Sequence, residues 1–418
     1  MALASAVSNR GSGGGYKLFR QRQFRELWAA NLLSSIGLVM LLLGSAWVML
    51  SLTTNPLMVS MVQTATSLPF LLLALPAGIM SDLYGHRRLL LGAHTWMLLA
   101  VAGLAALTFS GYLNAWSLLV ALSIIGIGLV FQQSAWKPFL HDLLPSDQLV
   151  SAISFNSLSN KLAQVVGPLT GGLLVGFKGA MLVLGTRALS HLVMIAVVRR
   201  VPRPAAGKRS DARSSREALA SFSDGWRVLR ASRQLYGPLI RLAVFMMPCT
   251  GMVALLPLEA KENIQTEVIG YGGLLTSLAL GTVSAVSLMP WLQGRARMGT
   301  LSSTALGGFS LAVLGISQWD SMLLDASFLL VAGFCWGILT VAHQWAIQTA
   351  SPADMRGLMT SFYSLVLQGS LATGSFLFGL IATQVGVSHT ILICGIVAAC
   401  GLLLVRVFPM PDAVAHAT

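Results

Sequence analysis

Long apolar stretches separated by short polar segments run through almost the whole chain. Each stretch holds about 20 residues, which lets an α-helix cross a hydrocarbon core of roughly 30 Å. Twelve such stretches are present, at about 27–50, 57–80, 89–109, 115–135, 149–176, 180–198, 238–258, 270–292, 300–317, 324–348, 357–383 and 389–407. The pattern therefore predicts an all-α membrane protein with twelve transmembrane helices.

Composition points to the same class. The chain is 55% hydrophobic and 10% charged, and its mean hydropathy is +0.75. A soluble domain carries roughly 25% charged residues, so these side chains cannot cover a surface that faces water on all sides. The lipid bilayer is therefore an expected partner.

The second half of the sequence repeats the helix punctuation of the first half. Positions 145–179 match positions 352–386 at a fixed offset of 207 residues. The shared residues are mostly turn formers and packing glycines, and the match ends with Gly179 and Gly386. A repeat in the same orientation predicts two six-helix bundles related by a parallel repeat.

The expected division of the chain follows from this repeat. It comprises a cytoplasmic N-terminal tail (1–22), an N-terminal six-helix bundle (23–199), a cytoplasmic linker (200–236), a C-terminal six-helix bundle (237–408) and a cytoplasmic tail (409–418). In the linker, Leu219, Phe222, Trp226 and Leu229 recur at helical spacing among arginines. This predicts an amphipathic helix at the inner leaflet, with an ordinary solvated linker as the alternative.

The net charge of +13 is explained by topology. Lys and Arg gather in the tails, the linker and alternate loops, whereas the opposite loops hold only Lys178 and Lys261. This positive-inside bias places both termini in the cytoplasm, and we expect no nucleic-acid partner. The first 20 residues lack the apolar core of a signal peptide. The four cysteines have no paired spacing, so we expect buried thiols rather than disulfides or metal ligands.

A short loop between the second and third stretches carries a conformational latch candidate. It contains Gly78, Asp82, Gly85, Arg87 and Arg88. The first glycine lets helices approach closely and the second permits a tight turn. Asp82 could pair with an arginine or cap a helix N-terminus across the cytoplasmic interface. A basic loop that only sets topology is the alternative.

The fifth stretch contains Gly167, Pro168, Gly171 and Gly172. A membrane helix tolerates this proline because neighbouring groups re-satisfy the freed carbonyl, and the glycines allow close packing. A generic kinked packing helix is the alternative to a functional segment.

With twelve helices in two halves, the loop at 78–89 resembles the signature of the major facilitator superfamily. A second copy at 292–299 keeps glycines and arginines but no carboxylate. The Gly-Pro-x-x-Gly-Gly run of the fifth stretch resembles the signature of the superfamily's drug:proton antiporters, which importers generally lack.

Further segments look like the enterobactin-exporter and macrolide-efflux branch of this superfamily. They are Gln133–Trp136, Leu140–Pro145, Asn156–Ser159, Gly237–Arg241, Leu255–Pro257, Gly270–Leu274 and Pro352–Arg356. The resemblance extends from about residue 20 to residue 411. It implies a secondary exporter in the bacterial inner membrane, in a branch that exports siderophores, macrolides and other amphipathic compounds.

Charged residues inside a membrane span are costly and mark functional sites. Lys161 lies near the midplane of the fifth stretch, and Arg187 and His191 lie at similar depth in the sixth. No carboxylate lies deep in any stretch to neutralise them, so they favour an anionic ligand such as a siderophore. The alternative is that they bond to helix carbonyls or neighbouring amides, or that Arg187 snorkels.

The other candidate substrate-binding residues flank Lys161 or lie on the tenth helix, which lines the cavity in the superfamily. They are Asn156, Asn160, Gln164, Trp336, His343 and Gln344. For proton coupling the candidates are His343, Glu26 at the cytoplasmic mouth and Glu259 at the outer mouth; His94 and His191 are the other deep histidines. A packing role is the alternative for His343.

The sequence contains no phosphate-binding loop, metal-ligand spacing or nucleophile–base pair. We therefore expect no cofactor, no metal and no enzymatic activity. The prediction is a monomeric secondary exporter that expels an amphipathic small molecule in exchange for protons. A nutrient importer or lipid flippase of the same fold is the first alternative, and a membrane sensor without transport is the second.

Overall fold

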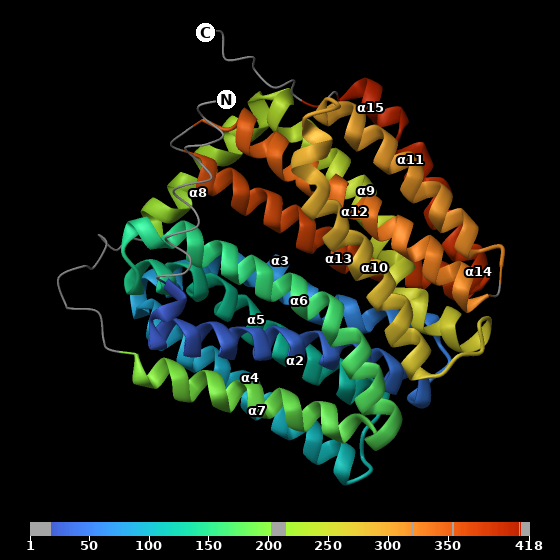
Figure 1. Ribbon diagram of the computed structural model, residues 1–418, viewed down its shortest axis with the longest axis horizontal. Helices are drawn as coiled ribbons and strands as arrows, with labels where there is room; N and C mark the ends of the chain where they lie inside the picture. The colour runs from blue at the N-terminus through green and yellow to red at the C-terminus, as the bar shows by residue number, and fades with distance from the viewer. Residues whose placement is uncertain (1–17, 202–214, 320, 353–354, 409, 411–418) are drawn as a thin grey trace.

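The computed structural model describes residues 18–201, 215–319, 321–352, 355–408 and 410. In these residues the secondary structure is helical, and the helices form two halves side by side (Figure 1). The N-terminal half comprises α2 (Arg22–Leu52), α3 (Pro56–Tyr84), α4 (His86–Phe109), α5 (Ala115–Leu143), α6 (Ser146–Lys178) and α7 (Ala180–Arg200). The C-terminal half comprises α9 (Arg233–Glu262), α10 (Val268–Gln293), α11 (Met298–Ile316), α12 (Met322–Ala350), α13 (Arg356–Val385), α14 (Val387–Cys400) and α15 (Leu403–Val407).

The predicted all-α fold of two six-helix bundles is confirmed. Within the described ranges, eleven helices are long and apolar enough to cross a membrane, counting α14 and α15 together as one. The twelfth, α6, is 33 residues long but interrupted by polar residues. These include Asn156, Asn160, Lys161 and Gln164, which the sequence analysis predicts to bind substrate.

Local sequence explains several helix ends. The side chain of Asn114 accepts a hydrogen bond from the backbone of Ser117, whose hydroxyl accepts one from the backbone of Asn114, so the pair caps the start of α5. The repeated residues Gly179 and Gly386 end α6 and α13 with φ of +73° and +86°, values that favour glycine. The sequence repeat therefore reproduces a helix-ending turn.

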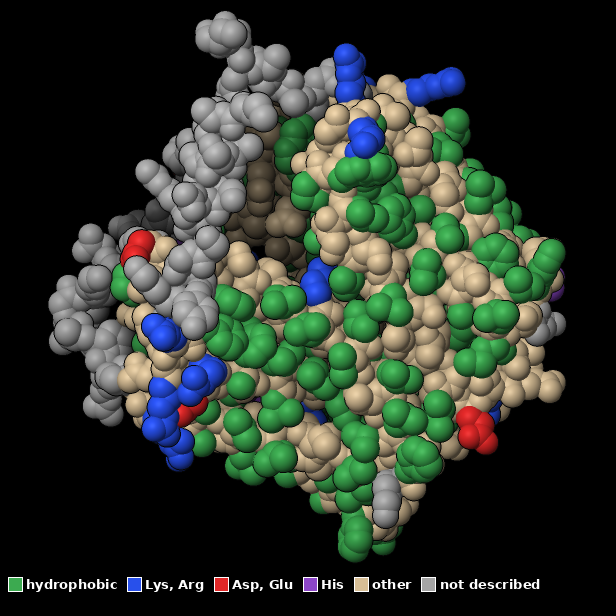
Figure 2. All heavy atoms as spheres, in the orientation of Figure 1, with side chains coloured by type: hydrophobic (Ala, Val, Ile, Leu, Met, Phe, Trp, Pro, Cys, Tyr) green, Lys and Arg blue, Asp and Glu red, His purple; other side chains and the backbone are tan. Residues whose placement is uncertain are grey.

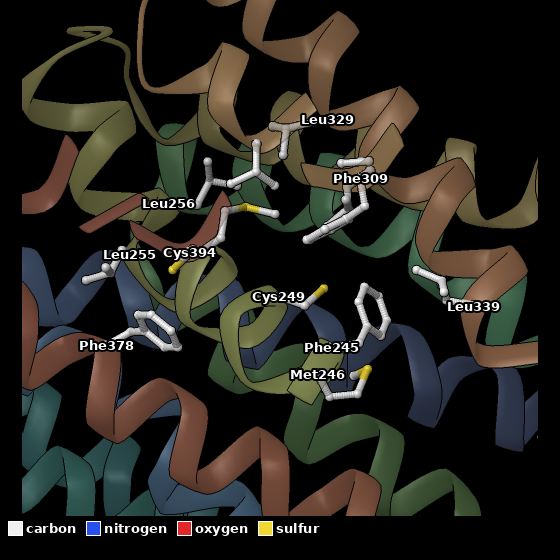
Figure 3. Close-up of a cluster of buried hydrophobic side chains, with 14 of the residues drawn as sticks. Phe245, Met246, Cys249, Leu255, Leu256, Phe309, Leu329, Leu339, Phe378 and Cys394 are labelled. Carbon is white, nitrogen blue, oxygen red and sulfur yellow. The ribbon is translucent and has the colours of Figure 1, made fainter. Parts of the chain in front are cut away.

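The repeat also governs helix packing. Within the N-terminal half, α2 packs on α6, α3 on α5 and α4 on α7; the matching pairs α9–α13, α10–α12 and α11–α14 recur in the C-terminal half. The two main contacts between halves, α3–α13 and α6–α10, are also equivalent under this repeat. Apolar side chains fill each half; Figure 3 shows Phe245 and Phe309 packed edge to face in the C-terminal half, close to Cys249 and Cys394.

The halves meet at the ends of their helices that lie far from the chain termini. There the Thr64 and Ser375 hydroxyls are 2.8 Å apart, and Lys261 Nζ donates to the Leu50 carbonyl oxygen at 3.1 Å. At the opposite end, Figure 2 shows a hollow between the halves, on the side where the termini lie. We call these the closed end and the open end.

Helix α8 (Ser215–Ala231) joins the halves and packs on the start of α13. The Phe222 and Trp226 rings lie 5.0 and 6.0 Å from the Phe362 ring, and Arg230 lies over Trp226 at 5.1 Å. The position of α8 at the inner leaflet of the membrane stays a prediction. Residues 1–17 of the predicted N-terminal tail, residues 409 and 411–418 of the predicted C-terminal tail, and linker residues 202–214 fall outside the described residues.

The cysteines differ in exposure. Cys249, Cys335 and Cys394 are buried free thiols, as expected from their apolar surroundings, whereas Cys400 is exposed.

Candidate substrate site between the two halves

One face of α6 is polar, and two neighbouring helices flank it. On one side, Gly167 and Gly171 pack against α2, where Cβ atoms on them would lie 2.7 Å from Val39 Cβ and 3.1 Å from Met40 Cα. On the other side, Gly172 packs against α10. Helical periodicity places the intervening stripe between the two contacts. This stripe, the polar face of α6, consists of Ser157, Asn160, Lys161 and Gln164.

Hydrogen bonds from neighbouring helices hold the polar face. The Asn156 side-chain oxygen accepts from Asn31 Nδ2 at 3.0 Å and from Trp136 Nε1 at 2.8 Å. One turn further, Ser35 Oγ donates to the Asn160 side-chain oxygen at 3.2 Å. Asn156 is therefore bound into the N-terminal half, whereas Asn160 keeps its amide group available.

Lys161 is half-buried in the polar face. It forms no hydrogen bond or ion pair with any residue that the structure describes. A half-buried ammonium without a counter-charge is costly, which makes the site attractive to an anion or to strong hydrogen-bond acceptors. Asn160 and Gln164 are exposed beside it and could supply amide donors.

The predicted residues on α12 differ in their exposure. Gln344 is exposed and Trp336 is half-buried, with its ring edge-on to Phe245 at 6.5 Å. His343 is buried inside the C-terminal half, where its Nδ1 donates to the Leu339 carbonyl at 2.6 Å. It lines a small cavity together with Arg241, a buried cation that the sequence reasoning missed.

Arg187 lies apart from the polar face. It is fully buried between α2, α4 and α7, and its Nη1 donates to the Ser34 carbonyl at 2.6 Å and to the Ser34 hydroxyl at 3.2 Å. The structure thus shows the helix-carbonyl alternative for Arg187. His191 lies one turn further along α7 and contacts His94 of α4. The predicted placement of Arg187 in the substrate site is therefore not supported by its contacts.

The predicted antiporter segment spans two interfaces. Gly167 and Gly171 serve the packing within the N-terminal half. Pro168 and Gly172 face the C-terminal half, and a Cβ on Gly172 would lie 2.8 Å from the Val268 carbonyl oxygen. The segment therefore allows the backbones of the two halves to approach closely at the closed end.

In the predicted latch, the Asp82 carboxylate pairs with a histidine instead of an arginine. Its Oδ1 lies 3.6 Å from His86 Nε2, and His86 Nδ1 lies 2.7 Å from Asp142 Oδ2. In this arrangement Asp82 therefore contacts the adjoining helix of its own half, and its pairing with an arginine or across the interface stays a prediction. The chain reverses at Gly85, whose φ is +85°.

The two latch arginines differ. Arg87 Nε and Nη2 donate to the Val198 and Arg199 carbonyls at 3.2 and 2.9 Å, which ties the start of α4 to the end of α7. Arg88 is exposed. A Cβ on Gly78 would meet nothing within 4 Å, so this glycine is not in a close helix contact here.

The two carboxylates proposed for proton coupling lie at opposite ends of the molecule. Glu26 pairs with Arg22 at 2.7 Å at the open end. Glu259 is buried at the closed end, where its Oε2 accepts from Asn263 Nδ2 at 2.7 Å and lies 3.4 Å from Ser388 Oγ. Neither residue belongs to the polar face of α6.

Two bundles joined by a linker, with a polar face between them, define a major facilitator transporter. A family model described as transmembrane secretion effector, a member of this superfamily, matches residues 13–418. The chain belongs to this family and is a multi-pass membrane protein.

Curated relatives of low identity include two efflux proteins. Macrolide efflux protein A of Streptococcus pyogenes is 23% identical over 387 residues, covering 90% of this chain and 94% of the relative. Multidrug efflux pump Tap of Mycolicibacterium fortuitum is 24% identical over 400 residues, covering 88% and 93%. These relatives are consistent with the drug-efflux branch that the sequence motifs resemble.

Solved transporters share the fold. The nucleoside transporter NupG superposes with a TM-score of 0.74 at 11% identity, covering 93% of this chain and 98% of that structure. An inward-facing bacterial homologue of the human lysosomal transporter Spinster gives 0.73 at 14% identity, with coverage of 93% and 98%. At such identities the likeness establishes the fold alone.

Proposed function

We propose that this chain is a secondary exporter of the bacterial inner membrane. It expels an amphipathic, siderophore-like small molecule from the cytoplasm in exchange for protons, by alternating access. The efflux relatives and the Gly-Pro-x-x-Gly-Gly segment support export. The placement of Lys and Arg along the sequence supports cytoplasmic termini. The protein acts as a monomeric transporter and not as an enzyme.

With the termini in the cytoplasm, the open end faces the cytoplasm and the closed end faces the periplasm. The arrangement described is then inward-facing, which is the state in which an exporter takes up its substrate. The polar face of α6 lies between the open end and the glycine contacts of the closed end. A substrate that enters from the open end would therefore stop at this face.

Lys161 is the observation that carries the substrate assignment. Its ammonium lacks a partner among the described residues and lies beside the amides of Asn160 and Gln164. A ligand with acidic or strongly accepting oxygens would satisfy all three groups, as the catechols of a siderophore do. Gln344 and Trp336 would contribute from the opposite half.

Three alternatives use the same fold. An importer would bind the same ligand at the same face but take it up in the outward-facing state, and the antiporter-like segment argues against it. A flippase would take an anionic lipid from the bilayer, and a sensor would bind without transport. The transport assay below distinguishes export from import and from binding without transport.

Everted membrane vesicles test the proposal directly. We expect energised vesicles to accumulate labelled enterobactin in preference to erythromycin, which carries a cationic amine. Replacement of Lys161 by Gln or Ala should lower enterobactin accumulation about tenfold, as loss of a partly buried charge contact implies. Lys137→Gln is the matched control, because Lys137 is exposed at the cytoplasmic end of α5.

Several results would contradict the proposal. If both Lys161 variants accumulate enterobactin at the parental rate and are normally expressed, Lys161 does not bind an anionic substrate. Depletion of substrate from energised everted vesicles shows import instead of export. Binding without any flux in liposomes points to the sensor.

A further inference from the structure

His94 of α4 and His191 of α7 form a buried pair away from the polar face of α6. Their Nδ1 atoms are 3.0 Å apart, their ring centroids are 5.3 Å apart, and neither side chain is exposed. A contact this short needs one Nδ1 that carries a proton and one that offers a lone pair. In this arrangement the two imidazoles therefore share one hydrogen bond, and at least one of them is neutral.

The chemistry of this contact gives the pair room for one additional proton. The imidazole that donates through Nδ1 has a lone pair on Nε2, and both Nε2 atoms are buried without a hydrogen-bond partner among the described residues. Protonation of that Nε2 keeps the Nδ1 hydrogen bond and makes it charge-assisted. A second proton would place hydrogens on both Nδ1 atoms and break the pair. The capacity is one proton.

Arg187 is the charged neighbour of both histidines. It lies one helical turn from His191, and its guanidinium is held by Ser34 of α2. In a dry site its positive charge opposes a protonated pair. The arrangement described is therefore the one in which the extra proton is absent.

The remaining charged and titratable groups on the surrounding helices lie toward the cytoplasmic ends. They are Arg22, Arg25 and Glu26 on α2, Asp82 and Tyr84 on α3, His86, Arg87 and Arg88 on α4, Lys137, His141 and Asp142 on α5, Asp147 on α6, and Arg199 and Arg200 on α7. Tyr112 follows α4 at the periplasmic side, and Lys161 lies on the polar face of α6, on the other side of α2. Arg187 thus dominates the electrostatics of the pair.

Helix α2 connects the pair to the polar face of α6. Ser34 binds Arg187, and the next residue, Ser35, donates to Asn160 at 3.2 Å. One turn earlier, Asn31 donates to Asn156. A proton on the histidines would repel Arg187 from Ser34, and any resulting shift of α2 would act on the substrate-binding amides.

We propose that His94 and His191 jointly carry the one proton that is exchanged for substrate. The pair binds the proton in the outward-facing state and releases it to the cytoplasm when Arg187 closes on Ser34, the arrangement described here. Because both rings are buried, proton exchange requires movement of α2, α4 and α7, which prevents a leak. This inference rests on the proposed antiport and assigns its proton site.

The test compares coupled and uncoupled transport of the full-length protein in proteoliposomes, with labelled enterobactin as the probe. His94→Gln and His191→Gln should lower accumulation driven by a pH gradient about tenfold. Counterflow, the exchange of labelled for unlabelled enterobactin without a gradient, should stay within about twofold of the parent. His141→Gln, at an exposed histidine of α5, should preserve both activities.

A second variant keeps the inference falsifiable if the glutamine variants fold poorly. Arg187→Gln removes the charge that opposes the protonated pair, so release of protons on addition of enterobactin to weakly buffered protein should move to more alkaline pH. An unchanged pH profile overturns the proposal.

Other outcomes are equally decisive. Gradient-driven accumulation by both histidine variants at the parental rate overturns the proposal, as does uncoupling by His343→Gln alone. Loss of counterflow in folded variants shows a structural role and also overturns it. If the parent itself counterflows but ignores the pH gradient, the proposed antiport fails first, independently of the histidines.

Discussion

Gly272 on α10 lies against Pro168 on α6, so close that a Cβ on the glycine would sit 2.6 Å from the proline carbonyl oxygen. This is a backbone contact between the two halves at the closed end, and a real side chain cannot occupy that space. We therefore expect Gly272→Val to hold the closed end apart. In a Cys400→Ser background, a cysteine at Thr276, which belongs to the same α6–α10 contact, should react at least several-fold faster with a membrane-impermeant thiol reagent added on the side of the closed end.

The adjacent glycine provides the control for this change. A Cβ on Gly273 would meet only the flexible end of Met322, at 3.7 Å. Gly273→Val should leave the labelling rate near the parental value. Equal labelling in both variants would show that the Gly272 contact does not determine closure.

Lys261 supplies the charged contact across the closed end. Its ammonium donates to the carbonyl of Leu50 in the last turn of α2, where the helix dipole is negative. Such a contact contributes about 0.3–1 kcal/mol, so Lys261→Met should shift the population toward the state that is open at this end by roughly two- to fivefold. Spin-label distances across the closed end measure the shift. Glu262→Gln, one residue further, should not change the distances.

Asn156 fixes the geometry of the polar face through its side-chain oxygen. Asn156→Leu leaves the donors of Asn31 and Trp136 without that acceptor, which should cost about 1–3 kcal/mol for each group that stays buried. We expect a lower unfolding temperature in detergent and a higher KM for substrate. Asn156→Asp keeps both acceptor bonds and should retain more of the stability. A thermal midpoint that drops equally for both variants would contradict this role.

Arg87 and Arg88 are adjacent in sequence but differ in their contacts. Arg87 binds two carbonyls at the end of α7, whereas Arg88 is exposed. Arg87→Ala should therefore lower the thermal midpoint measurably, since hydrogen bonds from a charged donor contribute about 1.5–3 kcal/mol. Arg88→Ala should leave it within error. Thermal unfolding followed by tryptophan fluorescence compares the two, and a reversed order would refute the assignment.

The fold could be predicted because the relevant signals are local. Apolar length marks each span, and the turns repeated at Gly179 and Gly386 mark the boundary that recurs in both halves. The polar face of α6 could also be predicted, since Asn160, Lys161 and Gln164 recur at helical spacing.

The rotation of each helix about its own axis could not be predicted from the sequence. Helix α7 is apolar on most sides, so periodicity does not tell which helix Arg187 faces. The His94–His191 contact joins residues 97 positions apart, and the Asp142 partner of His86 also lies on another helix. Such pairings depend on how packed helices are oriented, which composition and spacing along a single helix do not encode.

The two contacts between the halves, although equivalent under the repeat, differ in chemistry. At α3–α13, the Thr64 hydroxyl lies 2.8 Å from the Ser375 hydroxyl and donates to the Ala372 carbonyl at 3.1 Å. At α6–α10, close glycine contacts are accompanied by one longer hydrogen bond, from the Thr276 hydroxyl to the Val165 carbonyl at 3.4 Å. Separating the halves at the closed end thus breaks directional bonds along the α3–α13 contact and mainly dispersion contacts along the α6–α10 contact. We expect the halves to pivot about the α3–α13 contact while α6 and α10 slide past each other. The closed end would then widen first beside α6, next to Lys161.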